Sequence, residues 1–127
     1  HIARFLVKEF VDVEQAKDLL EVALAVDPNE PDVYHASAVL LHEVSVLHAQ
    51  AGNMEESVDC ELEMEKAWKC ALALHPAHPY AVHDYGNFLQ KTLRFNEAET
   101  LFKNSLVLHP KRPKLLWQYA FMLQCFR

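Results

Sequence analysis

The stretch PYAVHDYGNFLQKTLRFNEAETLFKNSLVLHP, residues 79–110, contains two helical patterns separated by a short break. Its first half places apolar side chains at helical spacing, at Val82, Tyr85, Phe88, Leu89 and Leu93. The pattern stops at residues 94–96, where Asn96 can cap a following helix. The second half resumes the spacing and ends at Pro110, with apolar side chains at Ala98, Leu101, Phe102, Leu106 and Leu108. The stretch therefore predicts a hairpin of two helices.

The last residues of this hairpin recur earlier in the chain. SLVLHP ends at Pro110, ALALHP ends at Pro76 and ALAVDP ends at Pro28. Pro76 and Pro110 are 34 residues apart, whereas Pro28 and Pro76 are 48 residues apart, which is 14 more. A fixed period of this size indicates stacked helical repeats, one of which carries an insertion.

The starts of the expected hairpins align as well, at Pro31, Pro79 and Pro113. A small residue stands seven positions after each proline, at Ala38, Gly86 and Ala120. A leucine stands three positions further on, at Leu41, Leu89 and Leu123. A small residue lets two helices approach closely, and the leucine fills the space beside it.

On these residues the chain resembles the tetratricopeptide repeat family, which has the same period. Gly86 matches the family's small residue in the first helix, and Ala98 matches its small residue in the second helix. Phe102 matches the aromatic residue that follows, and Pro110 matches the closing proline. The first repeat matches at Ala16, Leu20, Ala23 and Pro28. The family's tryptophan in the first helix is absent and is replaced by Tyr34, Val82 and Leu116. The resemblance implies an all-α fold, a right-handed α-solenoid of antiparallel helical hairpins with about 3.5 repeats.

The resemblance also implies how the chain divides. Residues 1–127 are expected to form a single array with a partial repeat at 1–30, a long one at 31–78, a regular one at 79–112 and a lone helix at 113–127. The helices are expected at 1–10, 13–27, 31–51, 54–75, 79–93, 96–109 and 113–126. Both ends cut through a repeat, so we expect a fragment of a longer protein, with self-association through the cut ends as an open alternative.

The fourteen extra residues of the second repeat divide evenly. Relative to the third repeat, seven lie before the turn at Gly52 and seven lie after it. Seven residues make almost two helical turns with a drift of about 20°, so each helix can lengthen by about two turns and still face its partner. The expected seam between the two long helices comprises Leu41, Val44, Leu47 and Ala51 on one side and Met54, Val58 and Leu62 on the other.

The second long helix is acidic. We expect this part of the hairpin to project beyond the array, with an acidic surface at Glu55, Glu56, Asp59 and Glu63, and further carboxylates at Glu61 and Glu65. Two interpretations stay open, because charged residues often form a solvated helix surface but also attract a basic partner.

Composition and charge exclude several classes of protein. The chain has only two glycines, which leaves little material for tight hairpin turns or phosphate-binding loops. Its net charge of −6 disfavours direct nucleic-acid binding. No apolar run reaches the roughly 18 residues of a membrane span, and no targeting segment is visible. Cys60, Cys70 and Cys125 have no CxxC spacing and are expected to be free thiols in a cytoplasmic or nuclear protein.

No catalytic or cofactor site is evident in the sequence. His35 and His42 share a helix face and His83 matches His35 in the next repeat, but none forms the tight two-ligand motif of a zinc site. No nucleophile has a visible base and orienting partner. We therefore expect a protein that is not an enzyme and has no catalytic residues, metal or cofactor.

The resemblance implies instead that the first helix of each repeat lines a concave groove for a peptide or a partner helix. In this chain that face comprises His35, Val39, His42, Tyr80, His83, Asn87, Gln90, Trp117, Phe121 and Gln124. Of the family's carboxylate-clamp pattern only Asn87 is present, since His83 and Phe121 stand where a lysine and an asparagine belong. The sequence thus predicts a protein-interaction scaffold whose protein or peptide partner it does not identify.

Other interpretations stay open. Trp117 and Phe121 are alternatively covered by a continuation of the array. The segment WQYAFML, residues 117–123, is also similar to the first helix of half-a-TPR repeats, which implies a component of an RNA-processing assembly. A third alternative is a purely structural segment of a multisubunit complex. Salt-dependent binding of nucleic acid would favour the component of an RNA-processing assembly. Concentration-dependent association without a ligand would favour the structural segment of a complex.

Overall fold

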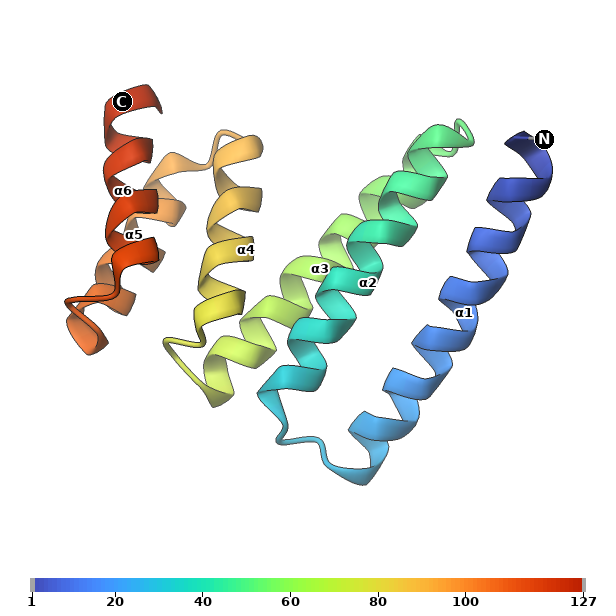
Figure 1. The fold of residues 1–127 in the computed structure, drawn as a ribbon, viewed down its shortest axis with the longest axis horizontal. Coiled ribbons are helices and arrows are strands. Elements are labelled where there is room, and N and C mark those ends of the chain that lie inside the picture. The colour runs from blue at the N-terminus through green and yellow to red at the C-terminus, as the bar shows by residue number, and fades with distance from the viewer. Residues whose placement is uncertain (1, 127) are drawn as a thin grey trace. The chain divides into compact units, whose positions relative to one another are not determined.

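The computed structural model describes the backbone of residues 2–126 and the side chains of residues 12–125. All regular elements in this part of the chain are α helices: α1 (Ile2–Val26), α2 (Pro31–Gln50), α3 (Met54–Leu74), α4 (Pro79–Lys91), α5 (Phe95–Leu108) and α6 (Pro113–Phe126). They form two compact units, unit 1 (His1–Leu74) with α1 to α3 and unit 2 (His75–Arg127) with α4 to α6 (Figure 1). The all-α expectation is confirmed for the described residues.

Prolines determine where three helices begin. Pro31, Pro79 and Pro113 are the first residues of α2, α4 and α6, a position where the missing N–H has no helical partner to lose. The residue before α4 also caps it, because Nδ1 of His78 accepts a hydrogen bond from the backbone N–H of Ala81 at 3.1 Å. The starts of these helices are therefore fixed by local sequence.

Residues with positive φ lie in the turns of the two hairpins. Gly52 has φ of 85° between α2 and α3, and Leu93 has φ of 61° between α4 and α5. Glycine adopts this conformation at little cost, whereas a leucine does so only where the surrounding structure compensates. The turn at Leu93 is closed by the backbone N–H of Arg94, which donates to the carbonyl of Leu89 at 2.8 Å.

The expected break between helices 1–10 and 13–27 is wrong, because α1 runs without interruption from Ile2 to Val26. Residues 2–26 contain no proline or glycine, so nothing in this stretch removes a backbone donor or favours a turn. The two expected helices are one helix of 25 residues.

The hairpin of α2 and α3 is longer than that of α4 and α5. Helix α2 has 20 residues and α4 has 13, so α2 is seven residues longer. Helix α3 has 21 residues and α5 has 14, again a difference of seven. The expected even lengthening of the two helices is therefore present. The expectation that this part projects clear of the other helices is wrong, because it packs against α1, where Val13 clusters with Val44 and Leu47 of α2.

The expected seam of α3 is wrong. Met54, Val58 and Leu62 are 60%, 52% and 56% exposed, and Ala51 before them is exposed as well. The residues that α3 buries are Ser57, Met64, Glu65, Ala67, Trp68 and Ala71. Side chains spaced by four positions rotate by about 40° per step around a helix, so a set chosen in this way leaves the packed face.

A buried pair of serines joins the two long helices. The Ser57 hydroxyl donates to the backbone carbonyl of Ser45 at 3.0 Å. Because that uses the only proton on Ser57 Oγ, the Ser45 hydroxyl is the donor in the 3.1 Å contact between the two hydroxyl oxygens. Small polar side chains at this position let α3 approach α2 closely while leaving no buried hydroxyl unpaired.

In unit 2, Gly86 lies where α4, α5 and α6 meet. A Cβ atom at this position would lie 2.5 Å from a ring carbon of Phe102 in α5 and 3.1 Å from Nε2 of Gln118 in α6. Phe102 and Ala98 of α5 are fully buried at 0% exposure, as is Met122 of α6. The close approach expected at Gly86 is therefore present. The corresponding Ala120 and Leu123 of α6 are exposed.

Candidate functional site

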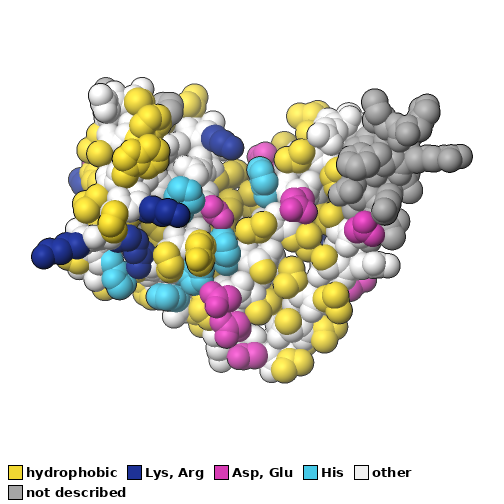
Figure 2. Space-filling view, in the orientation of Figure 1, with side chains coloured by type: hydrophobic (Ala, Val, Ile, Leu, Met, Phe, Trp, Pro, Cys, Tyr) yellow, Lys and Arg dark blue, Asp and Glu magenta, His cyan; other side chains and the backbone are white. Residues whose placement is uncertain are grey.

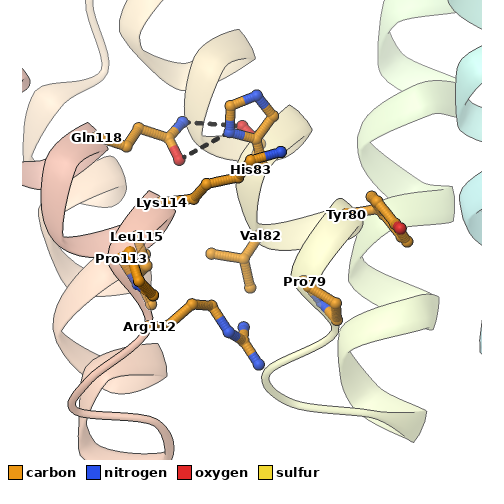
Figure 3. Close-up of a pocket in the computed structure, with 9 residues that line it drawn as sticks. All are labelled: Pro79, Tyr80, Val82, His83, Arg112, Pro113, Lys114, Leu115 and Gln118. Atoms are coloured by element: carbon orange, nitrogen blue, oxygen red, sulfur yellow. Dashed lines mark hydrogen bonds between the residues drawn. The ribbon is translucent and has the colours of Figure 1, made fainter.

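Gln118 joins α6 to α4 through three hydrogen bonds. Its Nε2 donates to the backbone carbonyl of His83 at 2.9 Å and to Oδ1 of Asn87 at 3.0 Å. Its Oε1 lies 3.2 Å from Nδ1 of His83, as Figure 3 shows. The Gln118 side chain is buried at 3% exposure, so the bonds are made away from water and hold the two helices in one register.

The partners of His83 assign its protons. Because Gln118 Oε1 can only accept, Nδ1 of His83 carries the proton and donates it. Nε2 is then the acceptor for the Asn87 amide, whose Nδ2 lies 3.4 Å away. His83 and Asn87 therefore hold α4 and α6 together rather than standing free on the surface.

A cavity of about 370 Å³ lies beside this network, between the first turns of α4 and α6. It is lined by Pro79, Tyr80, Val82, His83, Arg112, Pro113, Lys114, Leu115 and Gln118. Most of this lining is apolar, and no carboxylate contributes to it. In Figure 3, Val82 and Arg112 point into the space between the two helices, and Lys114 extends toward His83 in this view.

One wall of the cavity is held by the residue before α6. Nη1 of Arg112 donates to the backbone carbonyl of Ala77 at 2.7 Å, which fixes the segment that leads into α4. His78 in that segment packs edge-on against His75, with ring centroids 5.3 Å apart, and its ring also contacts Tyr80. The cavity is therefore bounded by fixed backbone as well as by side chains.

Two aromatic rings extend the exposed surface along α6. Trp117 and Phe121 stack with centroids 5.4 Å apart and are 65% and 43% exposed. Exposed aromatic pairs of this kind are enriched where proteins bind other proteins. Together with the cavity they give α4 and α6 one surface that combines a hollow, aromatic rings and cationic side chains.

The ten residues expected on a binding face have different environments. His35, Val39 and His42 lie on α2 in unit 1, where Val39 and His42 are exposed and His35 is half-buried. In unit 2, Tyr80, Trp117, Phe121 and Gln124 are exposed. The expectation for Gln90 is wrong, because it is buried at 8% exposure, and its Nε2 has no hydrogen-bond partner among the described residues. The cavity and the hydrogen bonds bring together Tyr80, His83 and Asn87.

Sequence reasoning missed Arg112, Lys114 and Gln118. Gln118 is the one polar residue between Leu115 and Met122 on α6, and a lone amide in an apolar run is a signal of a buried hydrogen-bonding role. Arg112 and Lys114 flank the first proline of the helix, a position whose nearness to α4 the sequence does not reveal.

The four carboxylates expected on the surface of α3, Glu55, Glu56, Asp59 and Glu63, are exposed. Glu65 is instead buried, and its Oε1 lies 3.6 Å from Nζ of Lys69. Burial raises the pKa of the Cys60 thiol above its ordinary value, and the nearby Glu63 carboxylate raises it further.

In the view of Figure 2, hydrophobic and acidic side chains share the surface of unit 1, while the visible Lys and Arg side chains lie over unit 2.

Metal binding and membrane insertion find no support in the described residues. No group of three or more His, Cys, Asp or Glu side chains in that part of the chain is placed to hold a metal ion. None of the described helices combines the length and the apolar character that crossing a bilayer requires.

A scan against protein-family models and a search of the curated proteins find no match to this chain. The resemblance to tetratricopeptide repeats therefore rests on the residues and spacings of the chain itself.

Proposed function

We propose that the protein is a non-catalytic interaction scaffold, a right-handed solenoid of tetratricopeptide type that binds a peptide or partner helix on the surface of α4 and α6. The observation that carries this proposal is the cavity between the first turns of α4 and α6, together with the exposed rings of Trp117 and Phe121 on α6. Binding sites are commonly concave, largely apolar and supplied with a few placed polar groups.

The chemistry of the cavity favours one kind of ligand. Val82 and Leu115 in its lining suit an aliphatic side chain of a bound peptide. Lys114 and Arg112 supply positive charge and no carboxylate lines the cavity with them, so a neighbouring acidic group on the peptide would be attracted. The preferred ligand is therefore a peptide with an aliphatic residue next to an acidic residue.

The hydrogen bonds of Gln118 support the same proposal. They fix α6 against α4 before any ligand arrives, so a peptide would not have to order the two helices. His35, Val39 and His42 of α2 stay proposed as further contacts for a partner. The expected location is the cytoplasm or nucleus.

The proposal is tested by selecting binders from a random linear peptide library displayed on phage. We expect enriched peptides to carry an aliphatic residue beside an acidic one. In the purified chain, Lys114→Glu should weaken the selected peptides by about tenfold or more because it reverses the charge at the cavity. Lys91→Glu, at an exposed position on the same unit outside the cavity, is the matched control and should leave the Kd unchanged.

Two results would overturn the proposal. One is that no peptide is enriched above a library panned on an unrelated helical protein. The other is that Lys114→Glu and Tyr80→Ala both leave binding of the enriched peptides unaffected, which would place their site elsewhere.

A further inference from the structure

Helix α3 carries an exposed apolar stripe outside its packed face. We define the α3 stripe as Met54, Val58 and Leu62, all more than half exposed. The side chains are four positions apart, so they form a continuous ridge over about 12 Å of the helix. The residues of α3 that pack inward are Ser57, Met64, Glu65, Ala67, Trp68 and Ala71, and none of them belongs to the stripe.

Carboxylates border the stripe. Glu55 and Asp59 follow its first two members along the helix surface, and Glu63 continues that row. All three are exposed, and Glu61 lies on the opposite border. Residues 39–65 contain no lysine or arginine. Lys17 of α1 lines a pocket together with Asp59 and Glu63, so the surface is predominantly acidic and includes a cation from the neighbouring helix.

The cations of α3 begin beyond the stripe. The first lysine of α3 is Lys66, and Lys69 lies 3.6 Å from Glu65; all three residues follow the last member of the stripe. The exposed end of α3 therefore combines uncovered apolar area with a predominantly acidic border, an arrangement whose complement is an apolar ridge flanked by cations.

We propose that the α3 stripe and its flanking carboxylates bind a basic amphipathic helix of a partner protein. Apolar side chains of that helix, at positions such as i, i+3 and i+7, would cover the stripe, and lysine or arginine beside them would face Asp59 and Glu63. About three helical turns would suffice to span the ridge. The inference rests on the proposed function as a scaffold, but it assigns a partner to a different helix.

The charge pattern selects this occupant over others. An acidic helix would face like charges, and the anionic surface of a membrane would be repelled in the same way. Helix α1 provides the comparison within the chain, because Leu19, Val22 and Val26 are also exposed. Residues 18–27 around that stripe hold three carboxylates, whereas residues 54–63 around the α3 stripe hold five, so the α3 stripe is the more acidic of the two.

The test uses three synthetic peptides of 18 residues or so, a length sufficient for several helical turns. The first is an amphipathic helix of leucine and lysine, the second has glutamate in place of lysine, and the third has the first composition in an order without an apolar face. Binding to the intact chain is measured by fluorescence anisotropy in low and in physiological salt. We expect only the first peptide to bind well, more weakly as salt rises.

Variants locate the site. M54Q/V58Q/L62Q removes the α3 stripe and should weaken the leucine–lysine helix by about tenfold or more. L19Q/V22Q/V26Q removes the equally exposed stripe of α1 and should change binding less than about twofold. If the first variant melts at a lower temperature, E55Q/D59N/E63Q replaces it, with D12N/D18N/E21Q on α1 as the matched control.

Several outcomes would overturn the inference. Equal binding of the scrambled peptide would mean that charge alone attracts it, and equal losses from the α1 and α3 variants would mean that no particular face is used. Sedimentation showing a dimer that M54Q/V58Q/L62Q abolishes would assign the stripe to a second copy of the chain. Lys114→Glu should leave this binding intact, so failure of the peptide site and failure of the α3 site are distinguishable.

Discussion

Gly86 of α4 faces the ring of Phe102 of α5 so closely that a Cβ atom on the glycine would lie 2.5 Å from a ring carbon. Phe102 is fully buried, and the same glycine also faces Gln118 of α6. These approaches bring α5 and α6 close to α4, and α4 and α6 carry the candidate binding surface. The arrangement of the cavity therefore depends on a position that itself contacts no ligand.

We predict that Gly86→Ala destabilises the protein. Alanine gains helix propensity over glycine, but a methyl group against a buried ring overpacks the contact by about 1–3 kcal/mol. The net free energy of unfolding should fall by about 1 kcal/mol, as measured by urea denaturation. Phe102→Leu makes room for the methyl group, so the cost of Gly86→Ala should be smaller in that background. Additive effects of the two changes would contradict the contact.

Gln118→Ala should destabilise unit 2 and loosen α6. It leaves the Oδ1 atom of Asn87 and Nδ1 of His83 without the partners they have now, at a cost of about 1–3 kcal/mol. Gln124→Ala changes an exposed glutamine of the same helix and should be close to neutral. Thermal melts measure the loss of stability, and hydrogen exchange of the α6 amides measures the loosening of α6. Equal melting temperatures for the two variants would show that Gln118 does not position α6.

His78 is predicted to act as a helix cap. His78→Ala removes the acceptor for the Ala81 N–H and should cost about 1 kcal/mol. His78→Asn keeps a side-chain acceptor at the same place and should recover most of that loss. If the asparagine variant unfolds at the same denaturant concentration as the alanine variant, packing of the imidazole rather than capping accounts for the effect.

Cys60 should be the least reactive of the three cysteines. Burial and the neighbouring Glu63 carboxylate raise the pKa of its thiol, whereas Cys70 and Cys125 are exposed. Since the thiolate is the nucleophile, iodoacetamide should label Cys60 several-fold more slowly near neutral pH. The raised pKa also means that folding favours the protonated thiol, so this contribution to stability is present below the ordinary thiol pKa and is lost as pH rises above it.

The effect of the Glu63 carboxylate on the pKa of Cys60 can be measured separately from the effect of burial. Glu63→Gln should lower the pKa of Cys60 toward its ordinary value and speed labelling in a variant that retains Cys60 alone. Glu99→Gln, on α5 in unit 2, is the control and should have no effect. Faster labelling of Cys60 than of Cys70 in the original chain would show that the thiol is not shielded.

Local sequence predicted the helix starts and the lengths of the long hairpin. Pro31, Pro79 and Pro113 act on their own backbone and need no tertiary contact to be effective. The lengthening of both helices by seven residues could be predicted, because seven residues return almost to the same helix face. The same reasoning placed a break in α1 where the chain has only ordinary helix-forming residues.

The face of α3 that packs inward could not be predicted in the same way. Met54, Val58 and Leu62 are more apolar than Ser57, yet Ser57 is buried because its small side chain fits against Ser45. Which face of a helix packs depends on the shape of the neighbouring helix as well as on hydrophobicity. The cavity depends likewise on Arg112 and Lys114 lying near residues more than thirty positions away in sequence, which spacing alone does not reveal.

The most direct test of the central claim is an ¹H–¹⁵N chemical-shift map of the chain titrated with a phage-selected peptide. Binding at the cavity predicts the largest shifts at residues 80–83 and 112–118, including the side-chain amide of Gln118, with little change in residues 95–108 of α5. Shifts concentrated in α5, or a selected peptide that binds without perturbing either segment of the cavity, would contradict the proposal that α4 and α6 form the binding surface.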